Sequence, residues 1–370
     1  MKYMGSKRVM LQNGLGKLLI QMANKSNRVF DPFCGSGIVT WYLSENCDRK
    51  VIAGDLQEYS IVMANALLMR DRPLTETEIK LLNEWVNSAE EISISSDYSI
   101  VAEPIDQDVL MERVESGESN DPITKAYGGY YFSFNQAQII DHLLKALPSE
   151  PTLENVALAA LIEAASVCVA APGHTAQPFR PTEKGLLAIN EAWKRDPLVY
   201  IRRTIANLGQ RYSKKIGEAK VSNAVDLLND LKENDLVFLD PPYSAVQYSR
   251  FYHVLETIAR KKPVETSGAG RYPPSTERPV SEYSKASTSL KATESILKKI
   301  SEAGAKAVFT FPAIETSNRL SGKIIEQVSK EYFKVKVCSN STNFSTLGGN
   351  NDIRPARKRT NELYIKMLPK

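Results

Sequence analysis

The stretch DPFCGSG, residues 31–37, decides the fold of this 370-residue chain. It follows the short apolar run 28–30 and precedes an amphipathic segment at 38–44, which is the order strand, glycine-rich turn, helix. A second apolar run, 50–55, ends in Asp55 and leads into another helical segment. Strands and helices that alternate at this spacing predict a doubly wound α/β sheet.

The chain changes character between residues 70 and 220, where helical periodicity dominates and strand patterns are few. Helices are expected at 79–89, 135–147, 155–170 and 197–214. Strand patterns return at 235–239, at 307–311, and in a terminal hairpin formed by 333–338 and 362–367. We therefore predict a sheet domain made of 1–69 and 221–370, and a mainly helical insertion at 70–220. A surface loop is expected at 267–289, which is rich in Ser, Pro and Gly.

Composition limits the class of protein. The four cysteines are scattered and there are only three histidines, so we expect neither a disulfide framework nor a metal site, and a reducing cytoplasm fits best. No apolar signal segment opens the chain. The longest apolar stretch, 156–171, is too short to cross a bilayer, so it predicts a buried helix and no membrane contact.

Charge is unevenly distributed along the chain. Residues 71–120 contain thirteen acidic and three basic residues, whereas residues 180–220 contain ten basic and four acidic ones. A basic stretch suits contacts with DNA phosphates, although two solvated helical faces of opposite sign would give the same pattern. The candidate DNA-binding residues are Arg180, Arg202, Arg203, Lys214, Lys215 and Arg250.

The glycine-rich turn predicts a ligand site at the end of the first strand. Glycines let the backbone approach a ligand, and the helix that follows favours electronegative groups. The third glycine of GxGxxG is missing, which disfavours a dinucleotide. Asp55 stands where a carboxylate can accept ribose hydroxyls, or it is simply a helix N-cap. Together with Asp31, it favours a nucleoside cofactor without a pyrophosphate.

The strongest chemical signal is Asp240-Pro241-Pro242-Tyr243, directly after an apolar strand. The amino group of a nucleobase is a poor nucleophile because its lone pair is delocalised into the ring. A carboxylate and a backbone carbonyl that accept its two hydrogens would draw the nitrogen toward tetrahedral geometry, and Tyr243 would stack on a base taken out of the duplex. An ordinary proline turn with an N-terminal Asp is the alternative.

In combination, these motifs resemble the Dam-like, alpha-group adenine-specific DNA methyltransferases. Three blocks occur in that group's order: Lys2-Tyr3-Met4-Gly5-Ser6-Lys7, then residues 31–37, then Asp240–Tyr243. The resemblance implies a Rossmann-like, class I S-adenosylmethionine-dependent methyltransferase fold in which the helical insertion is the target-recognition region. It also implies double-stranded DNA as substrate, a flipped adenine, a restriction-modification or phage-defence context with a cognate restriction endonuclease as a candidate partner, and a monomer or weak dimer.

Site residues carry over by position. Tyr3 and Lys7 would contact the methionine end of the cofactor, Lys7 by pairing with its carboxylate. Asp55 would bind the ribose hydroxyls and Leu56 would pack on the cofactor's adenine. Asn223 and Ala224 occupy the place of an Asp/Phe-type pair, and here the match is poor. The remaining cofactor residues are Asp31, Pro32, Phe33, Cys34, Gly35, Ser36 and Gly37; the catalytic ones are Asp240, Pro241, Pro242 and Tyr243.

Three alternative functions stay open at this point. A cytosine N4-methyltransferase would use the same chemistry, but such enzymes favour Ser in place of Asp240. A catalytically silent DNA-binding regulator could keep the fold, although Asp31, Asp55 and Asp240 are intact. A nicotinamide dehydrogenase is disfavoured by the missing third glycine. Methylation of cytosine carbon is disfavoured as well, because none of the cysteines follows a proline.

Overall fold

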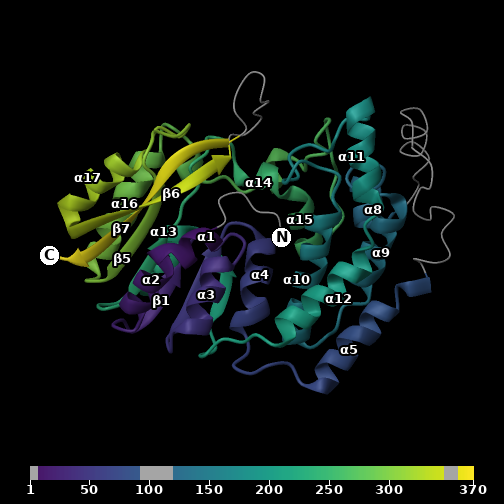
Figure 1. Ribbon diagram of the computed structural model, residues 1–370, viewed down its shortest axis with the longest axis horizontal. Coiled ribbons are helices and arrows are strands. Elements are labelled where there is room, and N and C mark those ends of the chain that lie inside the picture. The colour runs from purple at the N-terminus through teal and green to yellow at the C-terminus, as the bar shows by residue number, and fades with distance from the viewer. Residues whose placement is uncertain (1–6, 92–119, 346–356) are drawn as a thin grey trace.

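A central β-sheet organises the molecule (Figure 1). The computed structural model describes residues 7–91, 120–345 and 357–370, and within these ranges the sheet has seven strands in the order β3-β2-β1-β4-β5-β7-β6. β7 runs antiparallel to both of its neighbours, while the other neighbouring strands are parallel. The strands are β1 (Arg28–Asp31), β2 (Lys50–Asp55), β3 (Glu218–Val221), β4 (Leu236–Leu239), β5 (Lys306–Pro312), β6 (Phe333–Ser345) and β7 (Arg357–Pro369).

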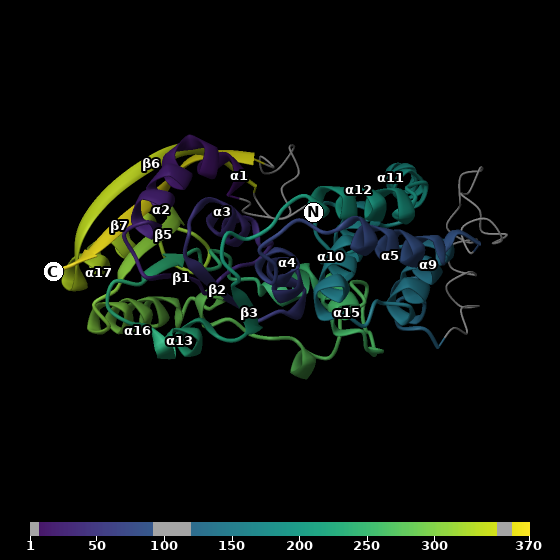
Figure 2. The same ribbon diagram turned by 90° about the horizontal axis from the view of Figure 1, so that it is seen from below.

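Helices cover both faces of this sheet, as Figure 2 shows. One face carries α1 (Arg8–Met10), a π-helical turn (Leu11–Leu15), α2 (Gly16–Ala23) and α3 (Ile38–Asn46); the other carries α13 (Ala224–Leu227), α16 (Ser289–Glu302) and α17 (Gly322–Tyr332). The period-2 pattern of β1 explains the two layers, because Val29 packs toward α2 and α3 while Phe30 packs toward α16. The doubly wound α/β sheet is confirmed.

A second lobe, almost entirely helical, lies beyond the β3 end of the sheet (Figure 1). Its helices are α5 (Glu76–Asn87), α8 (Pro122–Tyr127), α9 (Phe134–Lys145), α10 (Pro151–Cys168), α11 (Glu183–Trp193) and α12 (Pro197–Gly209). Capping boxes begin α5 at Thr75 and α9 at Ser133. α10 is apolar and long enough to cross a membrane, but 67% of it is buried, as in the core helix of a globular lobe.

The core of this lobe includes residues from outside the predicted insertion. α4 (Glu58–Leu68) contributes Tyr59 and Met63, and the segment after the proline turn contributes α14 (Tyr248–Phe251) and α15 (His253–Arg260). β3 was not predicted, and it shows that residues 218–220 of the predicted 70–220 insertion belong to the sheet. Among the residues that the structure describes, the helical lobe therefore comprises 70–91 and 120–217 together with α14 and α15.

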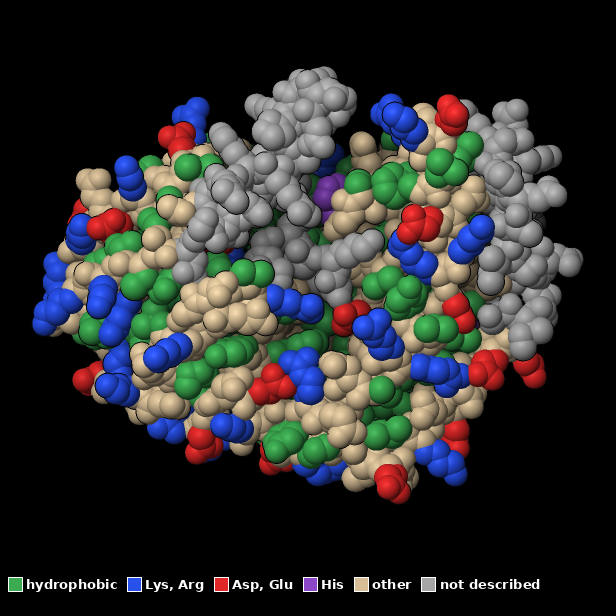
Figure 3. Space-filling view, in the orientation of Figure 1, with side chains coloured by type: hydrophobic (Ala, Val, Ile, Leu, Met, Phe, Trp, Pro, Cys, Tyr) green, Lys and Arg blue, Asp and Glu red, His purple; other side chains and the backbone are tan. Residues whose placement is uncertain are grey.

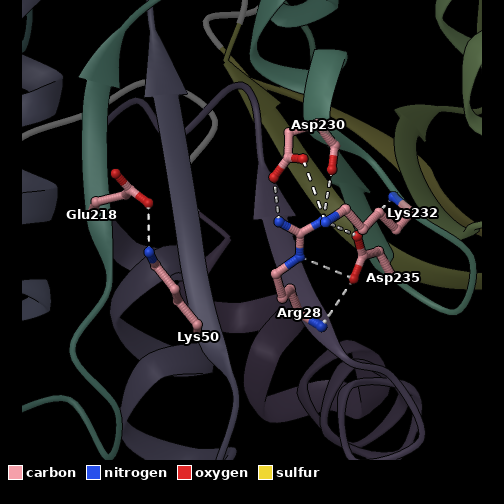
Figure 4. Close-up of polar contacts among 6 residues, drawn as sticks. All are labelled: Arg28, Lys50, Glu218, Asp230, Lys232 and Asp235. Atoms are coloured by element: carbon pink, nitrogen blue, oxygen red, sulfur yellow. Dashed lines mark hydrogen bonds and ion pairs between the residues drawn. The ribbon is translucent and has the colours of Figure 1, made fainter.

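At the amino-terminal ends of β1 and β4, an ion pair between Arg28 and the buried Asp235 joins the two strands (Figure 4). Asp235, which is fully buried, accepts hydrogen bonds from the backbone N–H of Arg28 and Lys232 and pairs with the Arg28 guanidinium at 2.7 Å. Arg28 also reaches Asp230 at 2.6 Å. The fork of one arginine therefore ties the start of β1 to the segment that leads into β4.

The end of the chain follows the sequence prediction. β6 and β7 form the expected terminal hairpin, with Phe333 opposite Pro369 and Val337 opposite Ile365. The predicted loop at 267–289 has only short 3-10 turns at Ser275–Glu277 and Glu282–Ser284 and an isolated bridge between Ser267 and Tyr272. It is not wholly superficial, since Tyr283 is buried against the sheet.

Candidate active site

A cavity of about 590 Å³ opens at the carboxyl-terminal edge of the parallel strands. One wall is the turn after β1 together with the end of β2, and another is Asp240–Tyr243 after β4. The two motifs, 200 residues apart in the chain, meet here because β1 and β4 are neighbours in the sheet. Predicted residues that line the cavity are Lys7, Asp31, Pro32, Phe33, Cys34, Gly35, Ser36, Asp55, Leu56, Asn223, Ala224, Asp240, Pro241, Pro242 and Tyr243.

The glycine turn depends on two left-handed residues. Gly35 has φ +49° and Gly37 has φ +75°, conformations that a β-carbon would strain. Gly37 N–H donates to the carbonyl of Cys34 at 2.8 Å, which closes the turn before α3 begins. Gly37 contributes the shape of the turn, while Gly35 and Ser36 line the cavity.

Asp31 ends β1 as a buried carboxylate with an incomplete set of partners. Its Oδ2 accepts a hydrogen bond from Thr40 Oγ1 at 2.6 Å, whereas Oδ1 is buried and has no hydrogen-bond partner in the part of the chain that the structure describes. Burial, with a smaller contribution from the charge of Asp240, raises the pKa of Asp31 to about 7, although Thr40 and the backbone of Phe33 oppose the rise. An unsatisfied, cavity-lining carboxylate oxygen favours a ligand that brings a positive charge or a donor.

Asp55 stabilises the turn through the backbone. Its Oδ2 accepts from Gly35 N–H at 3.0 Å and its Oδ1 accepts from Gln57 N–H at 3.1 Å. Burial raises the pKa of Asp55 to about 6, and these hydrogen bonds oppose the rise. The N-cap alternative is wrong, because α4 begins at Glu58 and the N–H groups of Glu58 and Tyr59 are bound by a different carboxylate.

That carboxylate is Glu256, from α15 of the helical lobe. Its two oxygens accept from the backbone N–H of Glu58 and of Tyr59, both at 3.1 Å, and Arg260 pairs with it at 2.9 Å. Negative charge at the first turn of a helix is stabilising. The helix α4, which follows β2, is therefore capped by a residue of α15.

The proline turn is held rigidly around Asp240. Asp240 Oδ1 accepts from Thr310 Oγ1 on β5 at 2.8 Å, and Asn318 Nδ2 donates to the carbonyl of Pro242 at 3.1 Å. The Tyr243 ring is 7% exposed and meets Phe311 edge to face, with 5.4 Å between the ring centroids. Asp240, the two prolines and Tyr243 are thus fixed relative to one another. The turn forms a rigid wall of the cavity as well as connecting β4 to the next segment.

A buried ion cluster completes this end of the cavity. Lys7 Nζ lies 2.9 Å from Asp240 Oδ1 and 2.9 Å from Glu362 Oε1, and it also donates to the hydroxyl of Tyr243 at 2.5 Å. Although burial opposes its charge, the two carboxylates hold the pKa of Lys7 well above its ordinary value. Burial raises the pKa of Asp240, with Lys7 opposing and Glu362 adding to the rise. Lys7 therefore contacts the proline turn, and the predicted partner, a cofactor carboxylate, would have to compete with Asp240.

Comparison with known proteins decides what this cavity belongs to. The D12 class N6 adenine-specific DNA methyltransferase family matches the chain over residues 3–307. The chain belongs to this family. A search of curated proteins finds no match. The methyltransferase transfers a methyl group to the N6 atom of adenine in DNA, as predicted, and its sheet has the class I methyltransferase fold.

The cavity of the methyltransferase fits a nucleoside cofactor that carries positive charge. At one end, the Oδ1 atom of Asp31 lacks a donor, and at the end of the next strand Asp55 lines the same cavity. Leu56 and Ala224 supply apolar wall, and Asn223 caps α13 by accepting from Asp226 N–H at 2.9 Å. Tyr3 lies outside the described residues. Within the described ranges, no group of three or more His, Cys, Asp or Glu side chains is arranged to hold a metal ion.

The six predicted DNA-binding residues do not form one surface. Arg250 is exposed and directly follows the lining residues Tyr248 and Ser249 in the chain, with its guanidinium 4.7 Å from the ring centroid of Tyr272. Arg180 is exposed in a loop whose Thr175 N–H donates to the carbonyl of Phe251 in α14. Figure 3 shows Lys and Arg side chains spread over both lobes of the face it presents.

The other four basic residues lie away from the cavity. Lys214 N–H donates to Ser44 at the end of α3, and Lys215 pairs with Asp48 at 3.8 Å, which places both at the amino-terminal edge of the sheet. Arg202, on α12, pairs with Glu90, and Arg203 is exposed on the same helix. The basic stretch 180–220 is thus divided among several surfaces.

Sequence analysis missed several residues of the site. Glu362, Thr310 and Glu256 act through contacts with residues 70 or more positions away, which leave no local pattern. Tyr248 and Gln247, which follow the proline turn, also line the cavity. The aromatic residues that follow the turn are divided between two environments, since Tyr248 lines the cavity whereas Phe251 and Tyr252 are buried in the helical core.

Proposed function

We propose that this cavity binds S-adenosylmethionine and the target adenine side by side. The observation that carries the proposal is one continuous cavity lined by both Asp31–Ser36 and Asp240–Tyr243. Its volume lies within the roughly 300–1,000 Å³ of small-molecule sites. The cofactor, when bound, supplies an electrophilic methyl group on a sulfonium.

On the cofactor side, Asp31 Oδ1 would accept from the ammonium of the methionine moiety. Its burial without a donor is what makes it the best candidate. Asp55 would accept the ribose hydroxyls in addition to the backbone N–H groups it already binds, because each carboxylate oxygen has two acceptor sites. Leu56 and Ala224 would cover the adenine of the cofactor.

On the substrate side, Asp240 would accept a hydrogen from the N6 amino group of a flipped adenine. Lys7 and Thr310 both bind Oδ1, so Oδ2 is the oxygen we assign to the amino group. The second hydrogen would go to the carbonyl of Pro241, because that of Pro242 is bound by Asn318. Tyr243 would stack on the base. These residues bind, orient and desolvate the reacting groups, and none of them forms a covalent bond.

The test separates cofactor binding from methyl transfer. Asp240→Ala should abolish N6-methyladenine, measured by mass spectrometry of nucleosides from DNA of a methylation-free host, while S-adenosylmethionine still binds in calorimetry. Asp48→Asn, an exposed acid at the amino-terminal edge, serves as the matched control. An active Asp240→Ala variant would overturn the role of the carboxylate, and 4-methylcytosine as product would overturn the assigned base.

We also propose that the helical lobe reads the DNA target, with Arg250 and Arg180 at the cavity side of it. Double-stranded DNA in the cytoplasm, a restriction-modification or phage-defence role with a cognate endonuclease, and a monomer or weak dimer remain parts of this proposal. Modification-sensitive sequencing of the expression host's DNA would give the recognition sequence, and survival of phage challenge would test the defence role.

A further inference from the structure

Glu362 contacts Lys7 and Tyr243 of the cavity wall, although it comes from β7, the last strand along the chain. It stands on β7 opposite Pro312 of β5, at the carboxyl-terminal edge where the cavity opens. It is beyond residue 307, where the family match ends. Its side chain is 12% exposed, in contact with the Lys7 ammonium, whose side chain is 3% exposed. Burying a carboxylate costs free energy unless a charged partner compensates for it, and here the partner of Glu362 is the Lys7 ammonium.

We propose that Glu362 is a positioning residue for methyl transfer, which shares the Lys7 ammonium with Asp240 and so leaves Asp240 a strong acceptor for the adenine amino group. This inference rests on the function proposed above for Asp240. The distances carry it: Lys7 Nζ is 2.9 Å from Oε1 of Glu362 and 2.9 Å from Oδ1 of Asp240. The ammonium is therefore divided evenly between the two carboxylates.

The charge balance explains why the division matters. Two carboxylates face one ammonium, so the cluster carries an excess negative charge when all three groups are ionised. Without Glu362, Asp240 would be the remaining carboxylate of the pair that binds the Lys7 ammonium, and a more fully paired carboxylate accepts a further hydrogen bond less strongly. Glu362 also accepts from the Tyr243 hydroxyl at 3.5 Å, which links it to the residue expected to stack on the base.

Other titratable groups face the same cluster. Asp31 at the end of β1 and Tyr248 on α14 interact electrostatically with Asp240, and Asp55 interacts with both Asp31 and Tyr248. All of them are present in wild-type protein and in a Glu362 variant. A difference in pH profile between the two proteins is therefore attributable to Glu362.

Glu362→Gln is the test, because glutamine keeps the size of the side chain and removes the charge. We expect kcat to fall about 5- to 50-fold, with KM for DNA and Kd for S-adenosylmethionine within about twofold of wild type. The acid limb of kcat against pH should move down by about one pH unit, since loss of a neighbouring negative charge makes Asp240 easier to ionise. Glu362→Asp should restore part of the rate.

The matched control is Glu315→Gln, which removes the same charge from an exposed position in the segment after β5. It should leave kcat and the pH profile unchanged. The inference is overturned if Glu362→Gln has the wild-type pH profile, whether its rate is normal or uniformly reduced. If Asp240 does not have the role proposed above, Asp240→Ala remains active in methyl transfer, whatever the result for Glu362→Gln.

Discussion

Replacement of Asp31 by Asn should remove most of the pH dependence of S-adenosylmethionine binding. Asp31 is buried, its Oδ1 has no donor, and its pKa is raised by burial to about 7. Below that pH the free protein holds the carboxyl group largely protonated, whereas a cationic ligand favours the ionised form. Binding should therefore release a proton and become tighter as the pH rises toward 7 and above.

The size of the effect follows from the pKa. For a pKa of about 7, the ionised fraction rises from about 3% at about pH 5.5 to about 75% at about pH 7.5, so affinity should increase by up to about 25-fold. In Asp31→Asn, only a weaker dependence centred near pH 6 should remain, because the pKa of Asp55 is raised by burial to about 6. Thr40→Val, which removes the donor to Asp31, should shift the midpoint upward.

Calorimetry across this pH range, in buffers of different ionisation enthalpy, measures both the affinity and the proton release. The same raised pKa has a second consequence in the ligand-free protein. As the pH rises from about 4 to about 7, the unfolded carboxyl group ionises and the folded one does not, which costs up to about 4 kcal/mol of stability. Asp31→Asn should thus unfold at a higher temperature than wild type near pH 7.5 without cofactor. An unchanged pH dependence of binding in Asp31→Asn would refute the reasoning.

Three further changes test other parts of the structure. Asp235→Ala removes the buried acceptor of two backbone N–H groups and of the Arg28 guanidinium, which Asp230 still binds, so the free energy of unfolding measured with denaturant should fall by about 2–4 kcal/mol; a loss below about 1 kcal/mol would contradict the role of Asp235 in joining β1 to β4. Glu256→Ala removes the cap of α4, and S-adenosylmethionine affinity should fall about 5- to 10-fold, whereas unchanged affinity would show that the cap does not support the cofactor site. Arg250→Ala should weaken DNA binding and reduce its salt dependence by about one phosphate contact, while the double variant Lys214→Ala/Lys215→Ala should bind DNA as tightly as wild type. If instead the double variant lost affinity and Arg250→Ala did not, the DNA would lie at the amino-terminal edge of the sheet.

The sequence predicted what depends on strand order and local chemistry. The turn after β1 and the turn after β4 meet at one cavity because residues at the carboxyl ends of neighbouring parallel strands always share an edge. By contrast, β3 was not predicted, because this edge strand is largely exposed and its sequence, Glu-Ala-Lys-Val, contains no apolar run. Basic residues that are near in sequence, such as Arg202 and Lys214, lie on different surfaces, because a run of charge does not specify which way the chain turns.

Partners in the ion cluster could not be predicted at all. Its position in the sequence predicts that Lys7 pairs with a cofactor carboxylate, and nothing local indicates that its ammonium also meets Asp240, which follows β4, and Glu362, which lies on β7. The pairing of β7 with β5, in which Glu362 lies opposite Pro312, brings Glu362 to the carboxyl-terminal edge of the sheet beside Lys7. The function of a buried carboxylate of this kind is visible in three dimensions alone.

The sharing of the helical core between two stretches of chain limits how the helical lobe can be exchanged between relatives. A graft of residues 70–217 alone would keep the host's α15, whose buried face belongs to the core of the lobe being replaced and whose Glu256 caps α4. In such a chimaera, the buried face of the host's α15 would pack against grafted helices from a different protein. A graft that also carries residues 248–260 would keep the lobe's own α14 and α15, and the recipient's α4 would then have to suit both the Glu256 cap and the packing now made by Tyr59 and Met63.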